Sequence, residues 1–189
     1  MKKDETILAP TLWRTFRALG NVNRLQCLKA VLKTPAATLE QIAGIVNISE
    51  PKASLALRSL QSRGLIASQR SSRWVMYIPD SEPSVQSAKP FLTAVKHALV
   101  TAEISEEEIS QIAKSYTHPR RINIVRALAS EGPISPAELS EQLQISAQAL
   151  DRHLRKLRSL DVVELSSGMC VLLKPKTKLA RDLLRIILA

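Results

Sequence analysis

The sequence predicts a mainly helical fold with small β-hairpins, built from two copies of one unit. Aromatic residues make up only 3% of the 189 residues while hydrophobic residues make up 45%, so the core must come from aliphatic side chains. This favours helices over a β-sandwich. Apolar residues also recur at helical spacing. The pattern of residues 24–66 then returns without a gap, 97 positions later, over residues 121–163.

The repeat pairs apolar residues with apolar residues at the same point of each unit. Leu57, for example, aligns with Leu154, and Leu60 aligns with Leu157. More than forty consecutive positions align in this way, which is typical of a repeated structural unit. We call the first unit copy one and the second copy two. The expected domains are 10–80 for copy one, 81–104 for a helical linker, and 105–189 for copy two with a C-terminal packing helix.

Within each copy the signals follow the order helix, helix, tight turn, helix, hairpin, which is the order of a winged helix-turn-helix. Thr38 and Ser135 each stand where an N-cap is expected, three residues before the Gln or Glu that completes a capping box. The expected turns are 47–49 and 144–146, the helices that follow them 50–63 and 147–160, and the hairpin strands 65–69, 74–78, 162–165 and 170–173.

Four further helices are expected outside these segments. The last of them is apolar on more than one face, so we expect it to be buried between partners, within the chain or across subunits. Pro90 is expected to start or interrupt the second. These helices are expected at 11–19, 88–101, 105–116 and 177–188.

The charge of the chain indicates a polyanionic partner. The net charge is +10 and the isoelectric point is near 10.0, which is typical of proteins that bind nucleic acid. Residues 1–97 carry 14 basic and 6 acidic side chains, a net charge of +8, and residues 98–189 carry 13 and 11, a net charge of +2. The excess positive charge therefore lies in the first half.

Other classes of protein are not expected. No apolar run approaches the roughly 20 residues that cross a bilayer, and residues 1–10 lack the apolar stretch of a signal peptide. The two cysteines cannot form a disulfide framework. A cytoplasmic location is therefore expected.

No enzyme chemistry is predicted either. The five glycines form no phosphate-binding loop, and no Ser/His/Asp or paired-carboxylate arrangement recurs at a telling spacing. His97, His118 and His153 lack the mutual spacing of metal ligands. We expect no catalytic residue, no metal site and no cofactor, with His118 as a helix cap or surface residue and His153 as a partly buried structural one. Cys27 and Cys170 are expected to be inert.

Several segments of both copies resemble the ArsR family of winged-helix regulators. In copy one the resemblance begins at the helix break Phe16–Asn21 followed by Asn23–Leu25, and in copy two it begins at His118–Ile122. It covers most of residues 10–175. The other segments that carry it are 47–49, 57–60, 64–66, 70–77, 145–146 and 152–157.

The resemblance implies a regulator that binds operator DNA. Members of that family bind DNA as two-fold dimers, pack their first and last helices together, and in many cases sense metal ions. Here the helix over 39–46, where the family has its cysteine pair, contains no Cys or His. The alternative His/Asp ligand set on the last helix is also missing, with only His97 near its position in copy one. We therefore expect no metal sensing.

A recognition helix places its exposed face in the major groove while its other face packs on the domain. In residues 50–63, Ala53, Leu57 and Leu60 form the packed face. The exposed face of copy two is expected to include Ala149 and Asp151. Each exposed charge is, on the alternative interpretation, ordinary solvated surface. The predicted DNA-contacting residues are Ser49, Lys52, Ser54, Leu55, Arg58, Arg70 and Arg73 in copy one, and Gln148, Arg152 and Arg155 in copy two.

The wings predict an asymmetry between the copies. Arg70 and Arg73 flank two serines in the joint 70–73, which suits contact with phosphates or a minor groove. The joint of copy two, 166–168, carries no charge and is one residue shorter. Trp74 and Tyr77 are expected to be packing residues. Copy one is thus the expected main contact with double-stranded DNA.

Two functional hypotheses follow. The first is a sequence-specific DNA-binding transcriptional regulator, whose single chain forms an internal pseudo-dimer, with a homodimer of four winged helices as the alternative assembly. The second is a winged-helix protein-interaction or scaffold module with only non-specific DNA affinity, because fold does not determine function.

Overall fold

A computed structural model describes residues 11–189 and shows a mainly helical fold with two small antiparallel sheets. The predicted fold class is confirmed. Residues 1–10 lie outside the described part, and with them the N-terminal stretch expected to lack a signal peptide and the first residue of the expected domain 10–80. None of the helices within residues 11–189 has the length and hydropathy that a bilayer crossing needs.

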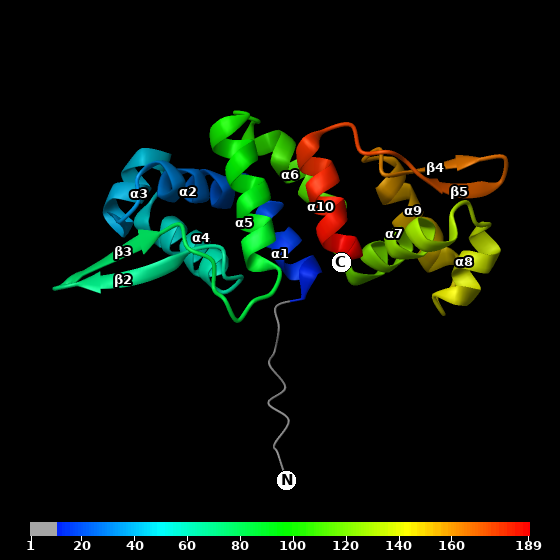
Figure 1. The fold of residues 1–189 in the computed structure, drawn as a ribbon, viewed down its shortest axis with the longest axis horizontal. Coiled ribbons are helices and arrows are strands. Elements are labelled where there is room, and N and C mark those ends of the chain that lie inside the picture. Colours follow the sequence, from blue (N-terminus) through cyan, green and yellow to red (C-terminus); the bar gives the residue numbers. More distant parts are fainter. Residues whose placement is uncertain (1–10) are drawn as a thin grey trace, which may run out of the picture.

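Copy one is a winged helix-turn-helix at one end of the molecule (Figure 1). Its hairpin gains a third, two-residue strand that the sequence had not indicated, because the segment leading into α3 pairs with the edge of β3. The elements are α2 (Val22–Lys33), β1 (Ala37–Thr38), α3 (Leu39–Val46), α4 (Glu50–Gln61), β2 (Ala67–Ser71) and β3 (Trp74–Ile78).

Copy two lies at the other end and has the same order of elements (Figure 1). The equivalent of β1 is a single bridge between Ile134 and Cys170. The elements are α7 (Pro119–Glu131), α8 (Pro136–Gln142), α9 (Ala147–Arg158), β4 (Val163–Ser166) and β5 (Met169–Leu172).

The remaining helices fill the space between the copies (Figure 1). The expected helix 88–101 begins at Ala88, with Pro90 inside its first turn, and its last turn is π-helical. The elements are α1 (Leu12–Leu19), α5 (Ala88–Lys96), the π-helix η1 (His97–Thr101), α6 (Glu106–Lys114) and α10 (Lys178–Leu188).

The two copies repeat the same backbone hydrogen bonds at an offset of 97 residues. In each turn one residue is left-handed, Asn47 with φ 56° and Gln144 with φ 51°. The residue that follows donates its N–H back to the preceding helix, from Ile48 to Ala43 and from Ile145 to Ser140, at 3.1 Å in both cases. The capping boxes predicted at Thr38 and Ser135 are also both present.

One arginine in each copy ties the first helix of the unit to the helix that precedes it. Arg24 on α2 donates from Nη2 to the carbonyl oxygen of Arg17 on α1 at 2.7 Å. Arg121 on α7 donates in the same way to the carbonyl oxygen of Lys114 on α6 at 3.1 Å, and both the donors and the acceptors are 97 residues apart. The helix pairs α1–α2 and α6–α7 are therefore equivalent.

Equivalent central helices pack against each other. α1 contacts α6, and α5 contacts α10, as expected for two copies related by an approximate two-fold rotation. Phe16 of α1 is fully buried at this junction. Its ring lies edge-on to Phe91 of α5, with ring centroids 4.9 Å apart, and 5.0 Å from the ring of Tyr116, which follows α6. The core is thus continuous from one copy to the other.

The expectation for the last helix was only partly right. α10 buries one stripe, formed by Leu179, Leu183 and Ile187, against its neighbours α5 and α7. Leu188 is 47% exposed. A single buried stripe is enough to hold a helix on the surface of a core.

The predicted hairpin joints were wrong in position and in length. Arg70 belongs to β2, because it pairs with Val75, so the turn is only Ser72–Arg73. The turn of copy two also has two residues, between Ser166 and Met169. The copies differ in their strands instead. In copy one Ala37 pairs with Tyr77, and three residue pairs of the hairpin lie between that level and the tip. In copy two Ile134 pairs with Cys170 at the equivalent level, and only one residue pair lies between it and the tip. The wing of copy two is therefore four residues shorter.

Candidate nucleic-acid interface

α4 has one buried face and one exposed face, as predicted. Ala53, Leu57 and Leu60 are fully buried against α2 and α3. On the opposite side Lys52 and Leu55 point to solvent, and Leu55 is 64% exposed. An exposed leucine between cations is compatible with contact to the methyl group of a thymine.

The remaining predicted residues of α4 complete this exposed face. Ser49 is the exposed N-cap and makes no side-chain capping bond, so its hydroxyl is free for another acceptor. Arg58 is exposed and donates from Nη2 to the hydroxyl of Ser54 at 3.1 Å. Ser54 is half-buried and orients the guanidinium rather than presenting its own hydroxyl.

The wing of copy one carries its two arginines near the tip of the hairpin. Arg70 and Arg73 are both exposed. The guanidinium of Arg73 lies over the indole ring of Trp74, 5.0 Å from its centroid. Trp74 is 48% exposed, so the prediction that it packs in the core was wrong, whereas the same prediction for Tyr77 is confirmed. Trp74 was misassigned because the alternation of side chains along a strand does not show that the hairpin extends beyond the body of copy one.

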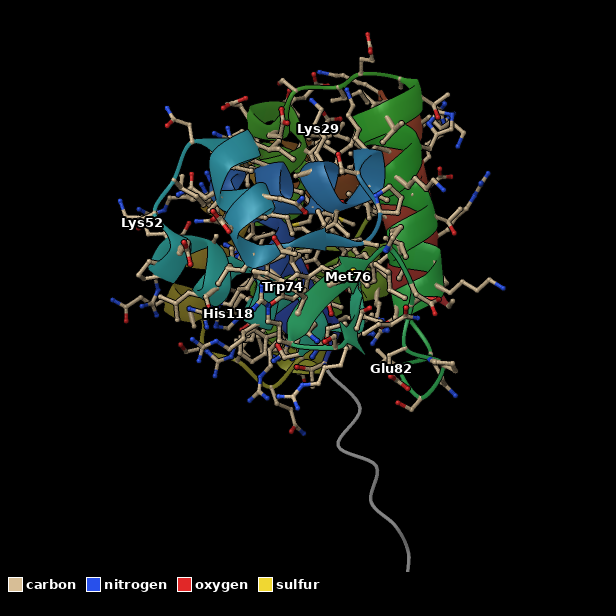
Figure 2. The ribbon with its side chains drawn as sticks, turned by 90° about the vertical axis from the view of Figure 1, so that its left-hand side faces the viewer. Lys29, Lys52, Trp74, Met76, Glu82 and His118 are labelled. Atoms are coloured by element: carbon tan, nitrogen blue, oxygen red, sulfur yellow. The ribbon has the colours of Figure 1, made fainter. Side chains whose placement is uncertain are left out.

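The recognition helix of copy one lies on the side of the molecule opposite α5. Figure 2 shows Lys52 at one edge and α5 at the other, with the hairpin residues Trp74 and Met76 between them, turned toward the viewer. Lys52, Leu55, Arg58, Arg70 and Arg73 therefore form an open surface on α4 and the wing. In the part of the chain that the structure describes, none of its four cations forms an ion pair.

At the predicted contact positions, α9 of copy two has one cation without an ion pair among residues 11–189, Arg152, where α4 has two, Lys52 and Arg58. Gln148 and Arg152 are exposed, but Ala149, expected on the exposed face, is buried and packs with Leu150. Arg155 forms an ion pair with Asp151 one turn earlier. The hydrogen bond from Arg155 lowers the pKa of the Asp151 carboxyl, so the acid stays ionised and offsets the charge of the arginine.

The wing of copy two has no charge at its tip and is undercut by a cavity. Ser166, Ser167 and Gly168 are exposed, and Leu165 is 48% exposed. A cavity of about 490 Å³ separates this hairpin from α8 and α9, and Cys170 forms part of its wall. The residue of copy one at the position of Cys170 is the larger Tyr77, which is buried.

The structure brings together two histidines that the sequence did not associate. His118 caps α7, accepting the Arg120 N–H on Nδ1 at 3.1 Å, as predicted for a cap. Its ring lies 4.5 Å from that of His153 on α9. The equivalent residues of copy one are Asn21, the cap of α2, and Ala56, which is buried on α4. Within residues 11–189 no three potential metal ligands gather.

Both cysteines are buried in the core. Burial raises the pKa of the Cys27 thiol to about 11 and also raises the pKa of Cys170. A thiol that stays protonated at neutral pH is a poor nucleophile and a poor metal ligand.

Two family descriptions match the chain, one on each copy. Residues 22–86, from α2 to the end of the first hairpin and beyond, are similar to the family described as "Sugar-specific transcriptional regulator TrmB". Residues 116–166, from the start of α7 to β4, are similar to the family described as "Helix-turn-helix domain". No curated protein matches the chain. Neither description names the ArsR family, so that resemblance stays a prediction. Together the two matches indicate a DNA-binding transcriptional regulator of the helix-turn-helix type.

Proposed function

We propose that this protein is a sequence-specific regulator that places α4 and α9 in the major groove and holds the DNA backbone with the wing of copy one. The observation that carries the proposal is the open basic surface of copy one. Lys52, Leu55 and Arg58 lie on one face of a helix whose other face is buried. A helix with this division is what major-groove recognition requires.

Each side chain of this surface suits a part of the duplex. Lys52 and Arg58 can donate to guanine O6 and N7 or to phosphates, and Leu55 suits the methyl group of thymine. Arg70 and Arg73 extend past the body of copy one, where the backbone or the next minor groove would lie. In copy two, Gln148 and Arg152 are available, whereas Arg155 is held by Asp151.

We further propose that one chain acts as an internal pseudo-dimer with an asymmetric DNA site. The pairing of α1 with α6 and of α5 with α10 supports this, because it joins the copies as two subunits would be joined. The two recognition helices carry different residues, and each good base contact discriminates by about 1–3 kcal/mol. Two different helices therefore prefer two different half-sites, with the stronger one under copy one.

Selection from random duplex DNA, combined with a solution mass measurement, tests this proposal. The expected result is an asymmetric site bound by one chain, with an affinity that falls steeply as salt rises, because phosphate contacts release counterions. A perfect palindrome bound by two chains would contradict the pseudo-dimer. Weak, sequence-independent binding would instead favour the scaffold hypothesis, which the lack of charge at the wing tip and the exposed Leu165 of copy two support.

Zinc is expected to leave this binding unchanged. The rings of His118 and His153 lie 4.5 Å apart, but structural zinc sites use four ligands and catalytic ones three. Titration of the DNA complex with zinc at micromolar concentration, followed by fluorescence anisotropy, should show no stoichiometric release. Release at one ion per chain would show that further ligands complete a site.

A further inference from the structure

A second concentration of positive charge lies where copy two meets α1. Its members come from three elements: Arg17 from α1, His118 and Arg120 from the start of α7, and Arg152 and His153 from α9. We call these five residues the central cluster. Arg17, Arg120 and Arg152 are exposed, and the two histidines are half-buried. Apart from Arg152, none of them was predicted to contact DNA.

The two histidines are held in fixed positions with their rings 4.5 Å apart. Because Nδ1 of His118 accepts the Arg120 N–H at 3.1 Å, the proton of this neutral imidazole is on Nε2, which can donate a hydrogen bond. His153 lies beside the buried face of α9, one turn after the buried Ala149 and next to the buried Leu154. The pair thus presents ring nitrogens rather than flexible side chains.

The cluster holds positive charge that the protein does not neutralise. Desolvation, His118 and three arginines (Arg121, Arg120 and Arg152) lower the pKa of His153 to about 4. Desolvation and Arg121, Arg120 and Arg17 likewise lower the pKa of His118. No acidic side chain among residues 11–189 counters either shift. In the same part of the chain, Arg17, Arg120 and Arg152 form no ion pair.

The equivalent place at copy one keeps only one of these charges, since Arg17 on α1 corresponds to Lys114 on α6. The residues 97 positions earlier are Asn21 for His118, Asn23 for Arg120, Leu55 for Arg152 and Ala56 for His153. Asn21 keeps the capping role, since its side chain accepts the Arg24 N–H at 3.0 Å, and Ala56 is buried. The fold of the unit therefore forms both with the uncharged residues of copy one and with the basic residues of copy two at these positions. The charges of copy two are therefore not required by the packing of the unit.

The cluster lies on the same side of the molecule as the recognition surface. Figure 2 shows His118 on the side of Lys52 and away from α5. The basic surface continues along α1, where the guanidiniums of Arg14 and Arg17 lie 5.2 and 5.4 Å from the ring centroid of Trp13. Partial burial and the charge of the nearby Arg14 lower the pKa of Arg63, just beyond α4. Positive charge thus runs from the end of α4 to α9.

We propose that the central cluster is a binding site for a backbone phosphate of the duplex, placed between the two half-sites. This inference rests on the proposed DNA-binding function and adds a second anchor to it. Copy one holds the backbone with its long wing. Copy two, whose wing is short and has no charge at its tip, holds it with the central cluster. A phosphate would accept from His118 Nε2 and from the planar guanidinium of Arg120, a donor group that suits phosphate. Arg17 beside His118 and Arg152 beside His153 add positive charge on either side.

The site also predicts that DNA binding takes up a proton. In the free protein, burial, His118 and the surrounding arginines lower the pKa of His153 to about 4, so the ring is neutral at pH 7. A bound phosphate offsets those charges and favours the protonated imidazole. The affinity for DNA should therefore rise as the pH falls from about 7.5 to about 5.5. Uptake of one proton on binding raises the affinity by at most about tenfold for each pH unit.

The experiment measures duplex binding by fluorescence anisotropy, across a salt series at pH 7.5 and at pH 5.5. The first variant combines Arg17→Gln with Arg120→Asn, and the second is His153→Ala; Asn and Ala are the residues that copy one carries. Lys96→Ala is the matched control, because it removes an exposed charge from α5, on the opposite side. The unfolding of each variant is measured at both pH values. The low pKa of His153 makes the folded state itself less stable as the pH falls from about 6.5 toward about 4.

The double arginine variant should lower the slope of log affinity against log salt by about two, one for each arginine that no longer neutralises a phosphate. His153→Ala should abolish the gain in affinity at pH 5.5, while Lys96→Ala should keep both properties. If the arginine variant keeps the wild-type slope, or if His153→Ala keeps the pH dependence, the inference is wrong. If the wild-type protein binds no duplex at all, the proposed function itself fails. Pyrophosphate that binds the cluster without competing with DNA would also overturn the inference.

Discussion

Replacing Arg70 and Arg73 together with alanine is expected to weaken DNA binding by at least about tenfold on every sequence and to lower the salt slope by about two. Both side chains are exposed near the tip of the longer hairpin, so they can reach phosphates but are not fixed against particular bases. Anisotropy titrations of a random duplex and of a selected site at several salt concentrations measure both quantities. The loss of affinity should be similar for the two duplexes.

The matched control is the wing of copy two. Ser166→Ala with Ser167→Ala changes two exposed residues at the equivalent tip, and we expect the affinity and the slope to stay within error of the wild type. The two hairpins differ in length by four residues. The comparison therefore shows whether the affinity depends on the long, basic wing of copy one or on the presence of a wing of either kind. An equal loss of affinity from the serine variant would show that both wings contact the backbone.

Phe16→Ala is expected to lower the free energy of unfolding by about 3–5 kcal/mol, the usual range for a buried phenylalanine. Phe16 is fully buried and touches aromatic rings from both halves of the chain. Its removal leaves a cavity at the junction of α1, α5 and α6 rather than inside one copy. Urea denaturation followed by circular dichroism gives the value, and a change in the number of transitions shows whether the copies unfold separately.

Leu188→Ala provides the comparison for this variant. Leu188 is 47% exposed at the end of α10, and surface substitutions usually change stability by about 0.5 kcal/mol or less. If Phe16→Ala cost no more than Leu188→Ala, the central junction would not be part of the core that holds the two copies together.

The fold could be predicted because its signals are local and occur twice. Capping boxes, turn positions and apolar stripes depend on residues within one or two helical turns, and the offset of 97 residues made each copy a check on the other. Thr38 with Ser135 and Ile48 with Ile145 are the clearest pairs. Such signals do not depend on how the copies are arranged in space.

The predictions that failed concern features that depend on tertiary structure. The strand pattern near Trp74 does not reveal that the hairpin extends past the body of copy one. The exposed face of α9 was predicted by analogy with α4, although Ala149 is turned inward by the packing of α9. The central cluster joins residues from α1, α7 and α9, and it became visible only when the crossing of these helices was known. The predicted DNA-contacting residues remain predictions until binding is measured.

If one chain acts as the pseudo-dimer proposed above, the pairing of α1 with α6 and of α5 with α10 within that chain makes the assembly independent of dilution. Separate subunits dissociate when their concentration falls below the dissociation constant of the dimer. Here the local concentration of one half around the other is fixed by the connecting chain, at about millimolar or above for a short connection. Occupancy of a DNA site by this chain should therefore rise with the first power of protein concentration rather than with the second. A cell holding only a few molecules would keep each of them competent to bind.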